Sequence, residues 1–128
     1  MSEARNLRKT TYRLYPTPKQ AVALADLKRT HQQLYNAALE ERISARSKAG
    51  KSISYADQCK SLTVLRRDLP EWADAANCSS QQMTLRRLDK AFGAFFRRVK
   101  AGQTPGFPRF KSLGRFSGFS FKSHGDGW

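Results

Sequence analysis

The side chains best suited to chemistry are basic and aromatic, and they gather in the C-terminal half of the chain. The segment Ala91–Lys111 reads AFGAFFRRVKAGQTPGFPRFK, and from Leu85 onward ten Lys or Arg residues face only Asp89 and Asp126. Cations neutralise phosphates, and aromatic rings stack on bases or pack behind a groove. Exposed helices usually mix the signs of charge, so this bias favours a nucleic-acid-binding surface. The predicted phosphate contacts are Arg86, Arg87, Lys90, Arg97, Arg98, Lys100, Arg109 and Lys111.

The aromatic residues of this segment also fit the core of a helical protein. Leu85, Leu88, Phe92 and Phe95 recur at steps of three and four, which is the spacing of one face of an α-helix. Aromatic residues at helical spacing usually pack inside a protein. We therefore expect Phe92, Phe95 and Phe96 to lie in the core and the cations between them to face outward.

Catalytic and metal-binding constellations are not evident in the sequence. The ten acids fall mostly on predicted helix surfaces or near helix ends, where solvation and pairing at i,i+4 explain them, and they form no convergent set for two-metal nuclease chemistry. Cys59, Cys78, His31 and His124 lack the spacing of a zinc site. We expect no catalytic residue, no metal, no cofactor and no disulfide, and we interpret His31 as a packed histidine.

Composition points to an anionic partner. The chain has 128 residues, a formal net charge of +14 and a pI near 10.5, with 39% hydrophobic residues, enough for a modest core in one domain or part of one. Nucleic acid is the first candidate partner and an anionic membrane surface the second. No apolar run approaches the roughly 20 residues that span a bilayer, and the N-terminus is not a secretory signal. These features predict a cytoplasmic protein without a membrane partner.

Three helices are predicted to position these side chains, over residues 18–49, 55–67 and 80–101. The first begins with the capping-box pattern Thr17–Gln20, in which Pro18 occupies the first helical position, and it ends at Gly50.

The other two helices have weaker start signals. Ser54 is a good N-cap for the second helix, with Asp57 three residues later, and Ser79 or Ser80 is expected to cap the third. Pro70 is expected to begin a connector between them.

Short strands are predicted on both sides of the helices. Lys9–Tyr15 alternates in character and ends at Pro16, and Phe119 and Phe121 alternate with polar residues. The layout is therefore mainly α with minor β, an α+β fold. Two strands make a marginal sheet. We expect a truncated protein or fragment, in which residues 103–128 are either folded or disordered.

Four motifs together resemble a known family. AFGAFFRRVKAG followed by PGFPRFK, and KTTYRLYPTPKQ followed by LYNAALEERI, resemble the N-terminal region of the OrfB transposases of IS200/IS605-type elements, also called TnpB. The resemblance extends from about Lys9 to Lys122. It implies a three-helix recognition block inserted between strands of an incomplete wedge-type β-barrel. The implied division is a wedge strand in residues 1–16, a helical recognition domain in 17–102, which older descriptions of the family call helix-turn-helix, and the truncated start of a second wedge segment in 103–128.

The resemblance also implies a function. Full-length members are RNA-guided DNA endonucleases, with a RuvC-like nuclease domain and a four-cysteine zinc ribbon further towards the C-terminus, and this chain ends before both. We therefore expect a module without its own cleavage activity that binds DNA and an element-derived guide RNA, with a nuclease domain possible in trans.

Base-reading positions are carried over from the family to Tyr55, Gln82 and Lys122. Gln can form a bidentate bond to adenine, and Tyr can pack against a thymine methyl group. The structural alternatives are a solvent-facing helix-start residue for Tyr55 and a capping-box residue for Gln82.

Three other functions stay open at this point. The chain could be a non-functional basic remnant of an insertion element, a small intact nuclease, or a basic protein at a membrane surface. The one-signed C-terminal half and the family motifs favour nucleic-acid binding over all three.

Overall fold

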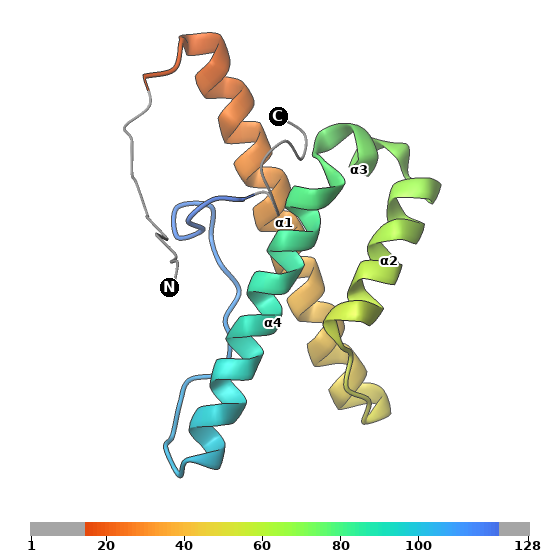
Figure 1. Cartoon of the computed structure of the whole chain (residues 1–128), viewed down its shortest axis with the longest axis vertical. Coiled ribbons are helices and arrows are strands. Elements are labelled where there is room, and N and C mark those ends of the chain that lie inside the picture. The colour runs from red at the N-terminus through yellow and green to blue at the C-terminus, as the bar shows by residue number, and fades with distance from the viewer. Residues whose placement is uncertain (1–14, 121–128) are drawn as a thin grey trace, which may run out of the picture.

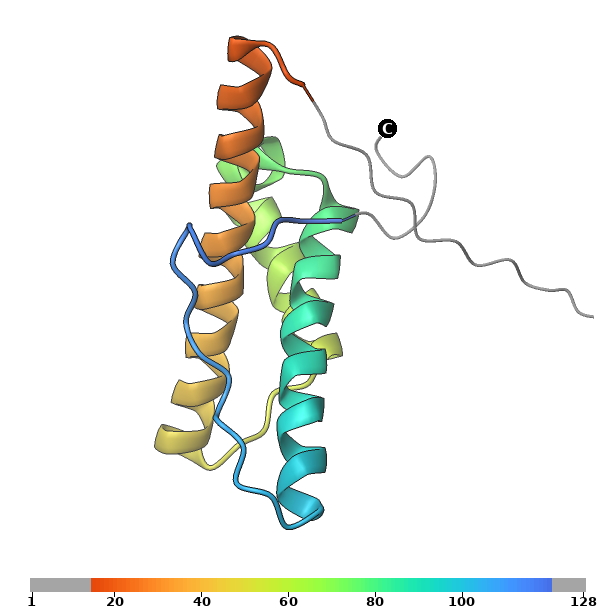
Figure 2. The same cartoon turned by 90° about the vertical axis from the view of Figure 1, so that its left-hand side faces the viewer.

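The computed structural model describes residues 15–120 and places four helices within them. The two long helices, α1 and α4, cross each other, α2 lies against them, and the short α3 leads from α2 into α4 (Figure 1). Residues 101–120 return along the α1–α4 pair without regular structure (Figure 2). The helices are α1 (Pro18–Ala49), α2 (Tyr55–Asp68), α3 (Pro70–Ala75) and α4 (Cys78–Lys100).

The predicted helix starts of α1 and α2 are confirmed by their capping boxes. Thr17 Oγ1 accepts from the Gln20 backbone N–H at 3.2 Å, and Gln20 Oε1 accepts from the Thr17 N–H at 2.9 Å. Ser54 and Asp57 repeat this arrangement at 3.1 Å in both directions. Gly50, with φ of 64°, ends α1 in the left-handed conformation that glycine adopts without strain.

Two predicted boundaries are wrong. Residues from Pro70 form the one-and-a-half-turn helix α3 rather than a connector, because proline is compatible with a first helical position. Helix α4 begins at Cys78 rather than Ser80, because Asn77 Oδ1 accepts from the Ser79 N–H at 2.8 Å and is the N-cap in place of Ser79 or Ser80.

The core lies where α1, α2 and α4 meet. Only the middle of α1 contributes to the core, because the N-terminal end of this helix projects from the bundle and Leu24 there is 39% exposed. The buried cluster consists of Leu34, Tyr35, Ala38, Leu39, Leu62, Leu85, Leu88, Phe92 and Phe116.

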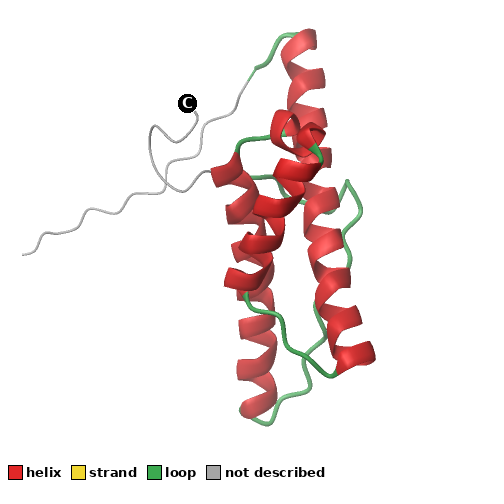
Figure 3. Ribbon diagram, turned by 90° about the vertical axis from the view of Figure 1, so that its right-hand side faces the viewer, coloured by secondary structure: helices red, strands yellow, loops and turns green. Residues whose placement is uncertain are grey.

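The predicted α+β fold class is wrong for the residues described. Residues 15–120 contain helices and loops and no strand (Figure 3), so this part of the chain is all-α and shows no part of a β-barrel. Tyr15 and Phe119, which were expected in strands, lie in irregular backbone. The remainder of both predicted strands falls outside the described residues. The division at residues 16 and 102 stays a prediction.

Helix side chains form the hydrogen bonds with the returning chain that a neighbouring strand would otherwise form. Asn36 Nδ2 and Gln32 Nε2 donate to the Lys111 carbonyl at 2.9 and 2.8 Å, and Asn36 Oδ1 accepts from the Lys111 N–H at 2.9 Å. Arg87 Nη1 donates to the Gly118 carbonyl at 2.6 Å. Irregular backbone bonded in this way needs no sheet to satisfy its polar groups.

Phe116 connects residues 111–120 to the core. The Phe116 side chain is 1% exposed, and its ring meets the edge of Tyr35 at 5.8 Å between centroids. The Arg87 guanidinium covers the Phe116 ring at 4.6 Å.

We predict that Phe116→Ala lowers the free energy of unfolding by about 3 kcal/mol, because it removes a fully buried ring and leaves a cavity. Urea unfolding followed by circular dichroism measures the loss. Phe110→Ala is the matched control, because Phe110 is 55% exposed, and its effect should stay below about 0.5 kcal/mol. Equal losses in the two variants would show that residues 111–120 do not pack as described.

His31 is a buried core histidine, as predicted from the sequence. Its side chain is 0% exposed, and its ring stacks on Phe119 with centroids 4.5 Å apart. Nδ1 lies 2.7 Å from the Leu27 carbonyl, which can only accept, so we assign the proton to Nδ1. Nε2 lies 2.9 Å from Ser80 Oγ, whose single proton also lies within reach of the Asn77 carbonyl at 2.9 Å. Burial lowers the pKa of His31 below its usual 6.5, and the nearby charge of Arg87 acts in the same direction.

The lowered pKa of His31 predicts a loss of stability in mild acid. Below pH 6.5 the unfolded chain binds a proton that the folded chain resists, so the free energy of unfolding falls as pH drops through that value. Urea unfolding at pH 7.5 and 5.5 measures the difference. In His31→Gln the titrating group is gone and the difference should shrink. An unchanged pH dependence in that variant would contradict the assignment.

Candidate nucleic-acid interface

Four cations form one exposed stripe on α4, here called the α4 basic face. Arg86, Lys90, Arg97 and Lys100 follow at steps of four, seven and three, which places them on the same side of a helix, and all four are exposed. At 1.5 Å per residue the stripe is about 20 Å long. A row of cations of this length can contact several phosphates.

A single carboxylate interrupts the cations of α4 along the sequence. Asp89 is the only acid between Leu85 and Ser120. Its Oδ1 accepts from Arg42 Nη2 on α1 at 3.0 Å. The positive charge of the stripe is therefore uncompensated along this part of the chain, which strengthens attraction to a polyanion.

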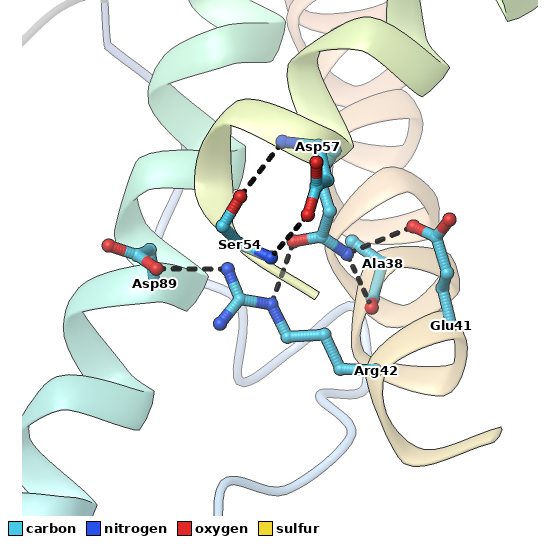
Figure 4. A network of polar contacts seen from close by, with 7 residues as sticks. Ala38, Glu41, Arg42, Ser54, Asp57 and Asp89 are labelled. Carbon is cyan, nitrogen blue, oxygen red and sulfur yellow. Dashed lines mark hydrogen bonds and ion pairs between the residues drawn. The ribbon is translucent and has the colours of Figure 1, made fainter. Parts of the chain in front are cut away.

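Arg42 fixes α4 relative to α1 and α2 (Figure 4). Its side chain is 10% exposed, and its Nε donates to Gln58 Oε1 at 2.9 Å. Gln58 Nε2 donates in turn to the Ala38 carbonyl at 2.8 Å and to a Glu41 carboxylate oxygen at 3.1 Å. The guanidinium also lies 4.9 Å from the centroid of Phe92. One side chain thus connects the three helices that position the α4 basic face.

We predict that Arg42→Met lowers the free energy of unfolding by about 2 kcal/mol, because Gln58 and Asp89 lose their partner while the apolar stem is kept. Arg67→Met is the matched control, since Arg67 pairs with Asp68 at 3.2 Å in an exposed position and such pairs contribute about 0.5 kcal/mol or less. Urea unfolding measures the loss of free energy of unfolding in both variants. A similar small loss in each would show that Arg42 does not join the helices.

Three of the predicted phosphate contacts make contacts within the protein, and one of them, Arg86, lies over the Tyr55 ring at 4.6 Å. Arg87 binds the Gly118 carbonyl and Ser117 Oγ, and Lys111 Nζ lies 5.9 Å from the centroid of the Tyr35 ring. Arg98 and Arg109 are exposed and lie outside the α4 basic face. The structure thus brings four of the eight predicted cations into one row, and phosphate binding by any of them stays a prediction.

Two of the candidate base-reading residues lie beside the α4 basic face. The Arg86 guanidinium covers the Tyr55 ring at 4.6 Å, and Gln82 precedes Arg86 by one helical turn. Burial raises the pKa of the Tyr55 hydroxyl above its usual 10, and the neighbouring Cys59 side chain acts in the same direction. Lys122 lies outside the described residues.

The role of Arg42 was not predicted from the sequence, and the prediction that Phe96 lies in the core is wrong. Arg42 follows the buried Ala38 by four residues and Leu39 by three, so its spacing alone was a signal for an inward position. Phe92 is buried and Phe95 half-buried, as predicted, but Phe96 is 60% exposed because it sits at the edge of the core face of α4.

Residues 15–120 show neither a metal-binding cluster nor a membrane-spanning helix. Within residues 15–120 no group of three or more His, Cys, Asp or Glu side chains is placed to hold a metal ion. None of the helices described is long and apolar enough to cross a bilayer. Cys59 and Cys78 are both free thiols.

Comparison with known families bears on the N-terminal part of the chain. Residues 6–51 match the model of the OrfB IS605 helix-turn-helix domain. No curated protein matches the chain. The match confirms, over those residues, the resemblance to the N-terminal region of IS605 OrfB transposases, and a helix-turn-helix domain of this family indicates DNA binding. It ends at Lys51, so the α4 basic face lies outside it.

Proposed function

We propose that this chain, which carries the N-terminal region of an IS605 OrfB-type transposase, is a nucleic-acid-binding module that contacts DNA phosphates with the α4 basic face. The observation that carries the proposal is the uncompensated row of four cations, whose neighbouring acid Asp89 is held by Arg42. The helix-turn-helix match supports DNA as the partner independently, because it concerns a different segment.

In this proposal the interface makes two kinds of contact with DNA, one to phosphates and one to base edges. Phosphate contacts fix where a protein sits on nucleic acid, and contacts to base edges supply sequence preference. The α4 basic face provides the first kind. Tyr55 and Gln82 lie at its N-terminal end, where a hydroxyl and a carboxamide can meet base edges once Arg86 binds the adjacent phosphate.

The resemblance supports a more detailed proposal. In it, the same module also holds a guide RNA derived from the element, acts in the cytoplasm, and leaves cleavage to a nuclease domain on another polypeptide. The high positive charge of the whole chain, +14, suits a protein that contacts two nucleic-acid strands at once.

We predict that neutralising the centre of the α4 basic face flattens the salt dependence of duplex DNA binding. Each lost phosphate contact reduces the slope of log affinity against log salt by about 0.9, so Lys90→Gln/Arg97→Gln should reduce it by about 2. Fluorescence anisotropy with a labelled duplex across a salt series measures the slope.

A matched control removes the same charge from cations that already have a carboxylate partner. Arg29 pairs with Asp26 at 3.1 Å, and Arg67 pairs with Asp68. Arg29→Gln/Arg67→Gln should therefore leave the slope nearly unchanged. Equal slopes in both double variants would refute the interface, and wild-type binding that is weak, sequence-blind and gone at about 0.2 M salt would identify a charged remnant instead.

A further inference from the structure

An apolar groove opens at the end of the bundle, among the C-terminal end of α1, residues 50–54 and the second half of α4. Its volume is about 480 Å³, within the range of pockets that hold small organic groups. The apolar side chains that line it are Ile43, Ile53, Phe92, Phe96 and Phe107. We call it the phenylalanine groove.

The rings of the phenylalanine groove are held in place but are not covered. Phe107 meets the edges of Phe92 and Phe95 at 5.4 and 5.2 Å between centroids, which fixes it against α4. Phe96 is 60% exposed and Phe107 46% exposed. Fixed and accessible aromatic rings form a stacking surface that loses little freedom when a flat group binds.

The charge around the phenylalanine groove specifies what kind of group fits. Arg46 and Lys51 line it and are exposed, and no Asp or Glu belongs to its lining. Neither cation takes part in an ion pair with a carboxylate among the described residues. An occupant that complements this site presents a flat apolar surface together with a negative charge.

We propose that the phenylalanine groove takes an unpaired base of single-stranded nucleic acid, stacked on Phe96 and Phe107, while Arg46 and Lys51 contact the adjoining phosphates. The proposal rests on the proposed function and adds a second, structurally separate contact to it. Bases within a duplex are stacked on each other and cannot enter, so the groove discriminates single strands from duplexes. Aromatic stacking of this kind tolerates any base.

The test compares single-stranded and duplex oligonucleotides that contain 2-aminopurine, whose fluorescence falls when the base stacks. We expect the wild-type chain to quench the single strand. Phe96→Ala should weaken single-strand binding about five- to hundredfold, the range of one lost base–aromatic stack, and leave duplex affinity unchanged. Because Phe96 is exposed, the substitution spares the core, and an unchanged melting temperature verifies this.

Phe110→Ala is the control for loss of an exposed ring elsewhere, since Phe110 is 55% exposed and lies outside the groove. It should leave both affinities unchanged. Single-strand affinity that is unaffected by Phe96→Ala, or that falls no more than duplex affinity, would overturn the proposal. So would Phe96-dependent binding of an acidic amphipathic peptide that displaces the single strand. Failure of the proposed function is seen separately: the salt dependence of duplex binding would then be the same for the wild-type chain and for the Lys90→Gln/Arg97→Gln variant.

Discussion

The packing of α1, α2 and α4 depends on one nearly buried charge, the guanidinium of Arg42, which has hydrogen-bond partners on two of these helices. A guanidinium removed from water is costly unless hydrogen bonds and an opposite charge replace its hydration. Arg42 obtains both, from Gln58 on α2 and Asp89 on α4, and its flat face lies on Phe92. Together with Arg42 itself, these groups come from three helices and therefore set how the helices sit together. The same arrangement pairs Asp89, the only acid in the sequence between Leu85 and Ser120, so one interaction affects both the packing of α4 and the charge of its exposed surface.

The remaining cations divide into two groups with different physical roles. Arg87 binds the backbone of residues 117–118 and covers Phe116, so its charge helps to hold the C-terminal segment against the core. Arg97, ten residues later on the same helix, makes no such contact and remains exposed. The division follows from helix geometry, because Arg87 faces the returning chain whereas Arg97 faces solvent.

Local signals in the sequence predicted the helices well and the strands badly. The capping boxes at Thr17 and Ser54 and the glycine at position 50 act within a few residues, so the bounds of α1 and the start of α2 followed from them. A strand requires a partner far away in the sequence, and alternation around Phe119 says nothing about whether that partner is there. In the structure, the Gly118 carbonyl next to Phe119 accepts from the Arg87 side chain instead.

The candidate site was only partly predictable for the same reason. The excess of cations is a compositional fact, and their spacing shows which of them share a side of α4. Whether a given cation is engaged inside the protein depends on long-range contacts, which is why Arg87 and Arg97 looked alike in the sequence. The phenylalanine groove could not be predicted because it joins Ile43 and Ile53 to Phe107, more than fifty residues away.

The family match covers only part of the folded unit, because it stops at residue 51. Leu39 on α1 is fully buried in a core completed by Leu62 and Leu88 on other helices. The partners of Arg42 lie on those helices too. The matched segment therefore lacks most of the core that it packs against, and the folded unit extends at least through Phe116.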